Sequence, residues 1–557
     1  MKKILLSLCL MMAAFSAMAI PVKPGMWSYI TLADGTEVRV QKVGDEHGHW
    51  LRAEDGRCYV MKGDVYVQVD AEALQVKRQA RVEVKNARRR SIYASTSDGL
   101  GKKGKMSMGA VPSIGEYTIP VVMVQFSDLK FKNTTTVAKM KRYYNEEGYS
   151  DEGCVGSVRD YFKAQSGGQF IPTFDVVGIV TLNKSYKYYG KNNDDGEDQG
   201  LDELPGHVIS AAISQLGVDF SNYVIPAADS YHKMGVPLLA ILYAGKGEAT
   251  EEETVSNSYY LWPCEWDDVE DPSGGNYNGV HFNSFFVGNE LNTGGYSLMG
   301  MSVFCHEFGH AMGLPDFYCT DYSYQYDDPF GFWSIMDSGA YVDGNCRLPI
   351  GYNAYEKSFM GWLELQEIGS AETITLQSPE GLAVNSAYVV RNSNTETFIF
   401  ENRQPGTWYP EKFGSGVLVS RIAYSYDLWK ENTLNNTKSR KRACALTADG
   451  ARLYYSASSS NLYGYSKTSI ASLKTLNGST KTIGITNIIK NGDGTITLTL
   501  SGDTSTPTVD GILEIRNHPS ITSANQRFYT LDGRFAGTDF NALPRGLYIV
   551  NGKKILK

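Results

Sequence analysis

Residues 306–316 read His-Glu-Phe-Gly-His-Ala-Met-Gly-Leu-Pro-Asp, and they are the part of the sequence most able to do chemistry. Residues four apart share one face of a helix, so a helix over residues 302–314 would direct His306 and His310 to one point. Gly313 can take the left-handed conformation that ends a helix, and the chain can then bring Asp316 back as a third ligand. Two imidazoles and one carboxylate leave the fourth position of tetrahedral zinc open, which predicts a catalytic zinc site.

Glu307 lies beside these ligands in the sequence and is predicted to be the general base. Zinc lowers the pKa of a bound water to about 7, so Glu307 can take its proton while the metal polarises a peptide carbonyl. The same carboxylate can then pass the proton to the leaving amine. An HExxH pattern also arises by chance on helices, but the extension to Asp316 argues against chance here. The predicted function is zinc-dependent endoproteolysis of proteins or peptides.

A second segment, residues 333–339, reads Trp-Ser-Ile-Met-Asp-Ser-Gly. It has the form of the Met-turn that lies beneath the zinc in metzincins. A single methionine is more often a core residue, but the place of Met336 in a turn downstream of the zinc segment favours the Met-turn interpretation.

Further segments carry a family resemblance: residues 120–128, 157–162, 354–362 and 400–404. Together with the zinc segment and the Met-turn, they make the sequence resemble the M6 family of metallopeptidases, the immune inhibitor A-like group, in which Asp replaces the third His of the metzincin pattern. The resemblance spans about residues 25 to 450. It implies a two-lobed zincin fold, a pro-segment, broad endoproteolysis and often bound calcium.

The sequence indicates calcium ligands less specifically than it indicates zinc ligands. Residues 229–234, where family members often carry Asp and Gly, are poor in carboxylates. Hard cations prefer clustered carboxylate oxygens. Two clusters qualify as candidates: Asp194, Asp195, Glu197 and Asp198, and also Asp321, Asp327 and Asp328. Solvated acidic loops are the alternative interpretation of both clusters.

The first 19 residues predict export. Met1-Lys2-Lys3, an apolar run over residues 4–15, and Ala17-Met18-Ala19 form the three parts of a secretory signal peptide cleaved after Ala19. The apolar run is shorter than the roughly 20 residues that a spanning helix needs. The predicted location is therefore outside the cell or on its surface.

The C-terminal tail carries a second export signal. Residues 529–534 and 543–550 look like the sorting tails of type IX secretion in Gram-negative bacteria. The outer-membrane secretion machinery would then be a partner. A small structural β module is the alternative.

Composition excludes other classes of function. A formal charge of −8 over 557 residues argues against a phosphate-binding surface, so nucleic acid is not an expected partner. Eight cysteines, one of them in the signal, have no CxxC spacing and predict no disulfide framework. The histidines outside the zinc segment form no second spaced set and are expected to be structural or exposed.

The predicted fold class is α+β: a metzincin-like zincin catalytic domain with an N-terminal β-rich pro-region and C-terminal β-sandwich domains. Strand-like alternation before about residue 84 gives way to a basic stretch that is expected to be an exposed linker open to trypsin-like cleavage. After about residue 365 the pattern is β, without helices. The predicted divisions are the signal (1–19), pro-region and linker (20–111), catalytic domain (112–365), β-rich domain (366–501) and sorting-tail-like module (508–557).

An inactive precursor of the peptidase would need a side chain that occupies the open coordination position of the zinc. Cys58 could supply a thiolate and Asp55 a carboxylate, although a chance cysteine on a surface hairpin is the more ordinary interpretation. A surface adhesin or glycan-binding protein with a structural zinc is the competing function. Glu307 counts against it, because a structural zinc needs no general base.

Overall fold

The computed structural model describes residues 22–502 apart from residues 24, 91–108, 195, 229–231, 268–276, 324–327, 369–370, 380–385, 394, 466 and 482. It also describes Ala17–Met18 and short segments between residues 528 and 556. The rest of the predicted signal peptide and most of the predicted linker therefore lie outside the described residues. Two units are present, residues 1–504 and 505–557. None of the described helices is long and apolar enough to cross a membrane.

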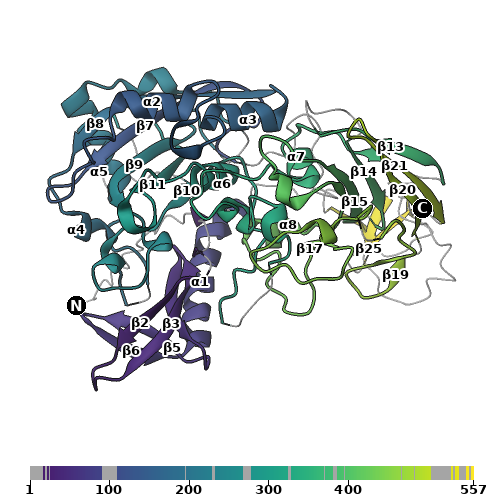
Figure 1. Cartoon of the computed structure of the whole chain (residues 1–557), viewed down its shortest axis with the longest axis horizontal. Coiled ribbons are helices and arrows are strands. Elements are labelled where there is room, and N and C mark those ends of the chain that lie inside the picture. Colours follow the sequence, from purple (N-terminus) through teal and green to yellow (C-terminus); the bar gives the residue numbers. More distant parts are fainter. Residues whose placement is uncertain are drawn as a thin grey trace. The chain divides into compact units, whose positions relative to one another are not determined.

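A mixed sheet forms the centre of the larger unit (Figure 1). Its order is β1 (Ala17–Met18), β10 (Cys264–Asp267), β11 (Ser284–Leu291), β9 (Leu239–Lys246), β7 (Gly115–Gln125) and β8 (Phe170–Thr181). β11, β9, β7 and β8 run parallel, whereas β10 pairs antiparallel with β11. α-Helices join β7 to β8 and β8 to β9, as the alternation of strand and helix patterns predicts, whereas β10 lies between β9 and β11 in the chain.

The apolar run of β7 is buried on both faces of this sheet. Ile119 and Met123 belong to one core, and Val122 and Val124 to the other. The first core also receives α2 (Val137–Asn145), α3 (Val158–Ser166) and α6 (Ser302–Ala311), while α5 (Leu204–Ala211) packs in the second. Covering both faces is what a continuously apolar parallel strand requires. As predicted, Ser157 caps α3, where its hydroxyl accepts a hydrogen bond from the Asp160 amide.

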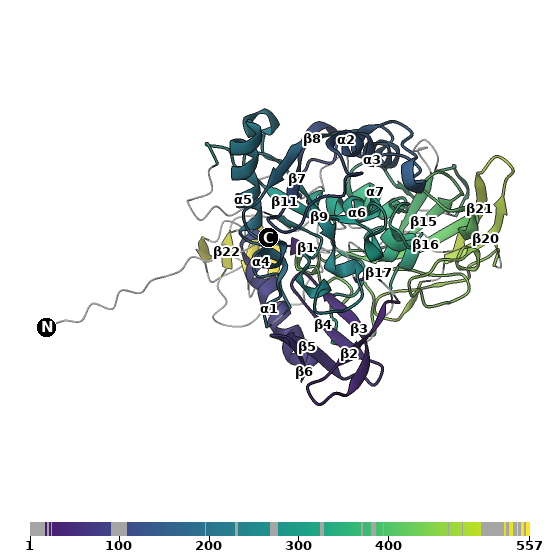
Figure 2. The same cartoon turned by 60° about the vertical axis from the view of Figure 1, so that its left-hand side comes forward.

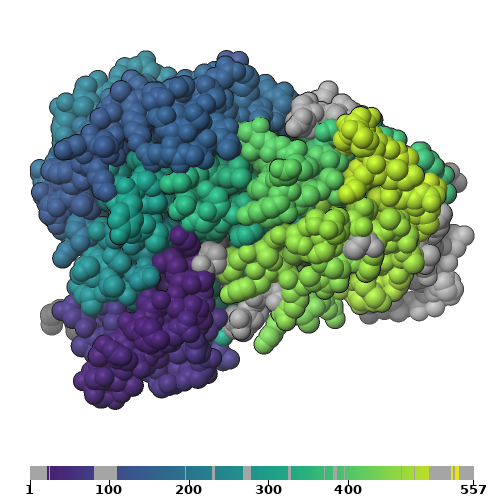
Figure 3. Space-filling model, viewed as in Figure 1, coloured from purple at the N-terminus to yellow at the C-terminus, as the bar shows by residue number. Residues whose placement is uncertain are grey.

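The N-terminal module, residues 22–90, contains a five-stranded antiparallel sheet: β2 (Trp27–Thr31), β3 (Glu37–Asp45), β4 (Gly48–Ala53), β5 (Cys58–Lys62) and β6 (Val65–Val69). Figures 1 and 2 show α1 (Ala71–Arg90) beside this sheet. Strands were predicted, but α1 was not, and its last turns occupy the start of the expected exposed linker. The space-filling view shows the module packed against the rest of the larger unit (Figure 3).

The C-terminal part of the larger unit has two facing sheets. One contains β12 (Gln366–Glu367), β14 (Ala387–Arg391), β15 (Glu396–Arg403), β16 (Gly416–Ala423) and β17 (Ala443–Ala445), and the other contains β13 (Thr373–Leu376), β21 (Ile496–Gly502) and β20 (Ile483–Lys490). Val390 and Phe398 of the first share a core with Leu376 and Ile485 of the second. The prediction that helices are absent here is wrong, because α8 (Tyr426–Lys430) follows β16.

The remaining elements are short. They include α4 (Tyr186–Gly190), α7 (Ala354–Phe359) and a hairpin of β18 (Leu473–Lys474) and β19 (Thr480–Lys481). The smaller unit holds one sheet, with β23 (Phe535–Gly537), β22 (Phe528–Thr530), β24 (Leu547–Val550) and β25 (Lys553–Leu556). The whole architecture is α+β, as predicted.

Candidate metal centre

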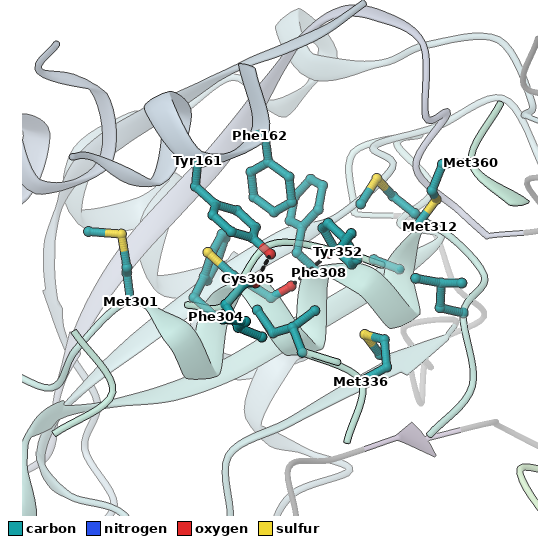
Figure 4. Packing of buried hydrophobic residues seen from close by; sticks show 14 of the residues in the cluster. Tyr161, Phe162, Met301, Phe304, Cys305, Phe308, Met312, Met336, Tyr352 and Met360 are labelled. Atoms are coloured by element: carbon teal, nitrogen blue, oxygen red, sulfur yellow. Dashed lines mark hydrogen bonds between the residues drawn. The ribbon is translucent and has the colours of Figure 1, made fainter. Parts of the chain in front are cut away.

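Helix α6 carries His306, Glu307 and His310, and all ten of its residues are buried. Two aromatic side chains of the helix, Phe304 and Phe308, are drawn in Figure 4, and they pack against Tyr144 and Phe162 respectively. The Tyr352 hydroxyl donates to the Cys305 carbonyl oxygen at 3.1 Å. These contacts on one side of the helix fix its position, which leaves the histidines directed to the other side.

The two imidazoles are oriented by backbone carbonyl groups. Nδ1 of His306 lies 2.6 Å from the Ile335 carbonyl oxygen, and Nδ1 of His310 lies 2.8 Å from that of Leu314. A carbonyl oxygen only accepts, so each Nδ1 carries the proton and each Nε2 keeps its lone pair. The two Nε2 atoms are 3.1 Å apart.

Asp316 completes the group after the turn that ends α6. Gly313 adopts φ +101°, the left-handed conformation predicted for it, and its amide donates to the His310 carbonyl oxygen at 2.7 Å. Oδ1 of Asp316 then lies 3.2 Å from Nε2 of His306 and 3.3 Å from Nε2 of His310. Three lone-pair atoms thus converge on one buried point, and within the described residues this is the one group of three or more metal-ligand side chains.

The electrostatics suit a cation at that point. Burial lowers the pKa of His306, which keeps its imidazole neutral and able to act as a ligand. Facing lone pairs on two nitrogens and a carboxylate repel one another, and a divalent cation removes this repulsion. The donor set of two imidazoles and one carboxylate matches the ligands of catalytic zinc.

Asn432 supports Asp316 and was missed from the sequence. Its side-chain amide donates to Oδ2 of Asp316 at 2.6 Å, and its Oδ1 accepts from the Asp316 amide at 2.8 Å. Asn432 follows α8 and has φ +53°, a conformation that asparagine tolerates better than most residues. It is separated from Asp316 by 116 positions, so no local pattern could have indicated the contact.

The segment predicted as a Met-turn lies next to the histidines. The Ile335 carbonyl orients His306, and the Met336 carbonyl oxygen accepts from the Phe317 amide at 2.7 Å. A Cβ added at Gly309 would stand 2.6 Å from Sδ of Met336. The turn therefore packs closely against the middle of α6.

The two predicted latency residues do not join the metal-ligand group. Cys58 is buried rather than on the surface, and it packs with Trp50 and Leu74, while burial raises the pKa of its thiol. Asp55 is about half exposed and pairs with Arg57 at 2.7 Å. Neither side chain is among the ligand atoms gathered around Asp316.

The acidic clusters offered for calcium are only partly described, because Asp195 and Asp327 lie outside the described residues. Asp194 is exposed, Glu197 accepts from the side chain of Asn193, and Asp198 accepts from the Trp262 amide. In the other cluster Asp321 accepts from Ser323, and Asp328 accepts from the Ser338 hydroxyl. Their described members form no group of three.

Comparison with known proteins shows that the central part of the chain is similar to one peptidase family. The model of the immune inhibitor A peptidase M6 catalytic domain matches residues 118–364. Pre-pro-metalloprotease PrtV of Vibrio cholerae serotype O1 is 25% identical over 244 residues, which cover 39% of this chain and 26% of the relative. Immune inhibitor A of Bacillus thuringiensis subsp. alesti is 23% identical over 321 residues, covering 51% and 45%. The chain spans less than half the length of these curated relatives.

Proposed function

We propose that the chain is a zinc-dependent endopeptidase that acts on proteins outside the cell, because residues 118–364 match the catalytic domain of the M6 peptidases. Its metal ligands would be His306, His310 and Asp316, and Glu307 would be its general base. A metzincin-type arrangement, with a Met-turn at Met336, belongs to the same proposal. Export through the predicted signal and synthesis as a zymogen are further parts of it.

The observation that carries the proposal is the convergence of Nε2 of His306, Nε2 of His310 and Oδ1 of Asp316 within 3.3 Å of one another. All three side chains are buried, and their other polar atoms are held by the backbone or by Asn432. A site kept in this way is preorganised, so little reorganisation is needed when a cation binds.

Zinc in this site would supply a Lewis acid for the peptide carbonyl and for an activated water. The protein supplies the proton chemistry. Glu307 follows His306 directly on α6 and is buried, so its carboxylate can accept a proton in a site shielded from bulk water. It can then release that proton to the amine of the leaving peptide. A general base next to the ligands favours catalysis over the adhesin alternative.

The test uses protein freed of its N-terminal module by limited trypsin treatment. Wild type should bind one zinc ion per chain and cleave casein, and a zinc chelator should abolish the cleavage. Glu307→Ala should keep its zinc and lose activity by a factor of 10² or more, the contribution typical of a general base. Zinc binding with undiminished cleavage by Glu307→Ala would reject Glu307 as the base, and absence of bound zinc would reject the site.

A further inference from the structure

The loop that carries the third candidate ligand, residues 313–320, contains no helix or strand, although every residue in it is described. Its first amides bond back to α6, and the Phe317 amide donates to the Met336 carbonyl oxygen at 2.7 Å. An irregular loop has no repeating hydrogen bonds of its own, so other segments must satisfy the rest of its backbone and fix its course. Those contacts decide where the carboxylate of Asp316 lies in this ligand loop.

The start of the ligand loop is held by residues 429–436, a support segment in the C-terminal part of the larger unit. Nε1 of Trp429 donates to the Gly313 carbonyl oxygen at 3.0 Å. Asn432 binds both the amide and the carboxylate of Asp316. Each of these contacts joins residues 116 positions apart, so a distant part of the chain fixes both the turn that ends α6 and the ligand after it.

The end of the ligand loop is held by the same support segment. The Asn435 side-chain amide donates to the Phe317 carbonyl oxygen at 2.7 Å. The Thr320 amide donates to Oδ1 of Asn436 at 2.9 Å, and the Thr320 hydroxyl donates to the Asn432 carbonyl oxygen at 2.6 Å. Hydrogen bonds from the support segment therefore lie before the third ligand, at it and after it.

The support segment is anchored to the C-terminal sheet. The Trp429 ring stacks on Phe359 with ring centroids 4.7 Å apart. Asn435 is fully buried, and its side chain makes two hydrogen bonds, of 2.8 and 3.0 Å, with the backbone of Ala443 in β17. The ligand loop is thereby connected to a sheet outside the part of the chain that matches the M6 catalytic domain, which ends at residue 364.

We propose that the support segment is a positioning part of the active site, which holds Asp316 where it can bind the zinc ion. The inference rests on the proposed function and extends the catalytic unit of this chain into the C-terminal sheet. The Ile335 carbonyl orients His306 independently, so loss of the support segment's hydrogen bonds affects the third ligand and leaves this imidazole in place. Such outer hydrogen bonds raise metal affinity, because they restrict the ligand before the cation binds.

The test measures zinc affinity by competition with a chromogenic chelator in full-length Glu307→Ala protein, which cannot process itself. Trp429→Phe keeps a stacked ring and removes the indole donor, whereas Thr320→Val keeps the shape of the side chain and removes the hydroxyl donor. Each change should weaken zinc binding at least tenfold, the effect typical of a lost outer partner.

Trp362→Phe is the matched control, because the buried Trp362 indole donates to the Ser113 carbonyl oxygen at 2.6 Å, outside the ligand loop. The Tm of the metal-free protein should fall by similar amounts in Trp362→Phe and Trp429→Phe, since each loses one buried hydrogen bond of the same kind. Trp362→Phe should nevertheless bind zinc as its parent does. An equal loss of zinc affinity in this control, or unaltered affinity in both Trp429→Phe and Thr320→Val, would overturn the inference.

Cobalt(II) in place of zinc gives a second measurement, because its d–d absorption bands report the geometry of the ligands. The bands should change in Trp429→Phe and Thr320→Val and stay the same in Trp362→Phe. Unaltered bands in the first two variants would mean that their hydrogen bonds contribute only to stability, which overturns the inference. A parent protein that binds no metal would instead reject the proposed metal centre, and the inference with it.

Discussion

Asn432 is the residue whose contact makes Asp316 a fixed ligand. It binds both the backbone and the carboxylate of Asp316. Replacing it with alanine leaves Oδ2 of Asp316 without its donor and frees the carboxylate to rotate. Loss of such an outer partner typically costs 10- to 100-fold in metal affinity. We expect Asn432→Ala to weaken zinc binding by this factor, measured by competition with a chromogenic chelator. Exposed Asn222→Ala should bind zinc as wild type does, and equal affinities for both variants would contradict the role of Asn432.

For single residues of the site, the sequence could predict only those contacts that follow from local spacing along the chain. A helix and a glycine turn link His306, His310 and Asp316. The spacing within eleven consecutive residues was therefore enough to predict that the three side chains meet. Asn432 reaches the same place by tertiary packing and belongs to no recognisable motif. Cys58 and Asp55 were chosen by residue type alone, and neither lies among the gathered ligand atoms.

At the scale of elements, α6 and the Met-turn are in direct contact, and Gly309 makes that contact possible. Gly309→Ala would gain about 1 kcal/mol of helix propensity. Its Cβ would also come within 2.6 Å of Met336 Sδ, and overpacking of this kind costs about 1–3 kcal/mol. We expect net destabilisation of about 1 kcal/mol in chemical denaturation. In the double variant with Met336→Ala the cost of Gly309→Ala should disappear, and strictly additive effects would show that the two residues do not interact.

A second link between elements joins the Met-turn to α7 and depends on pH. Glu356 is buried, accepts from the Ser334 hydroxyl, and forms a capping box with Asn353. Burial raises its pKa from 4.5 to about 7. The folded state then binds a proton that the unfolded state has lost, so stability should fall as pH rises from about 4.5 to 7, by about 3 kcal/mol.

The measurement is the free energy of unfolding at pH 5 and pH 7.5. Glu356→Gln cannot titrate, so its stability should lose this component of the pH dependence. Glu372→Gln is the control, because Glu372 is exposed. Equal pH dependence of Glu356→Gln and wild type would refute the assignment.

Elements with strong apolar periodicity, such as β7, α3 and α6, were predictable from the sequence, whereas α1 and α8 were not. Among the described side chains of α1, the buried ones are Leu74, Gln75 and Arg78, so only one of them is apolar and they form no apolar stripe to recognise. Helix α8 has five residues, too few to show a period of 3.6. Contacts with distant parts of the chain position both helices. α1 packs on the loop after Asp316, and Asn432, which binds Asp316, follows α8.

At the scale of the whole molecule, the proposed zymogen requires an N-terminal module that binds tightly to the rest of the larger unit before cleavage and leaves after it. Lys42 carries much of that attachment. Its ammonium group lies 3.0 Å from Glu248 and 3.0 Å from Glu253, and all three side chains are buried. Burial would raise the pKa of Glu248, but His49 and Lys42 lower it to about 2. Removing one partner from such a buried group costs about 3–5 kcal/mol, because the remaining charges are left without compensation.

Lys42→Met should therefore weaken the attachment of the module by at least 100-fold. In Glu307→Ala protein cut by trypsin in the basic segment after α1, the wild-type module should stay bound and co-elute in size-exclusion chromatography, whereas the Lys42→Met module should separate. Lys62→Met is the matched control, since Lys62 and its partner Asp194 are exposed 3.9 Å apart, and surface pairs contribute about 0–1 kcal/mol. Co-elution of the Lys42→Met module at the same concentration would mean that apolar contacts, such as those of Trp50 and Leu74 with Tyr318, hold the module without this ion pair. Separation of the Lys42→Met module alone would mean that the buried ion pairs of Lys42 with Glu248 and Glu253 hold the module in place after the chain is cut.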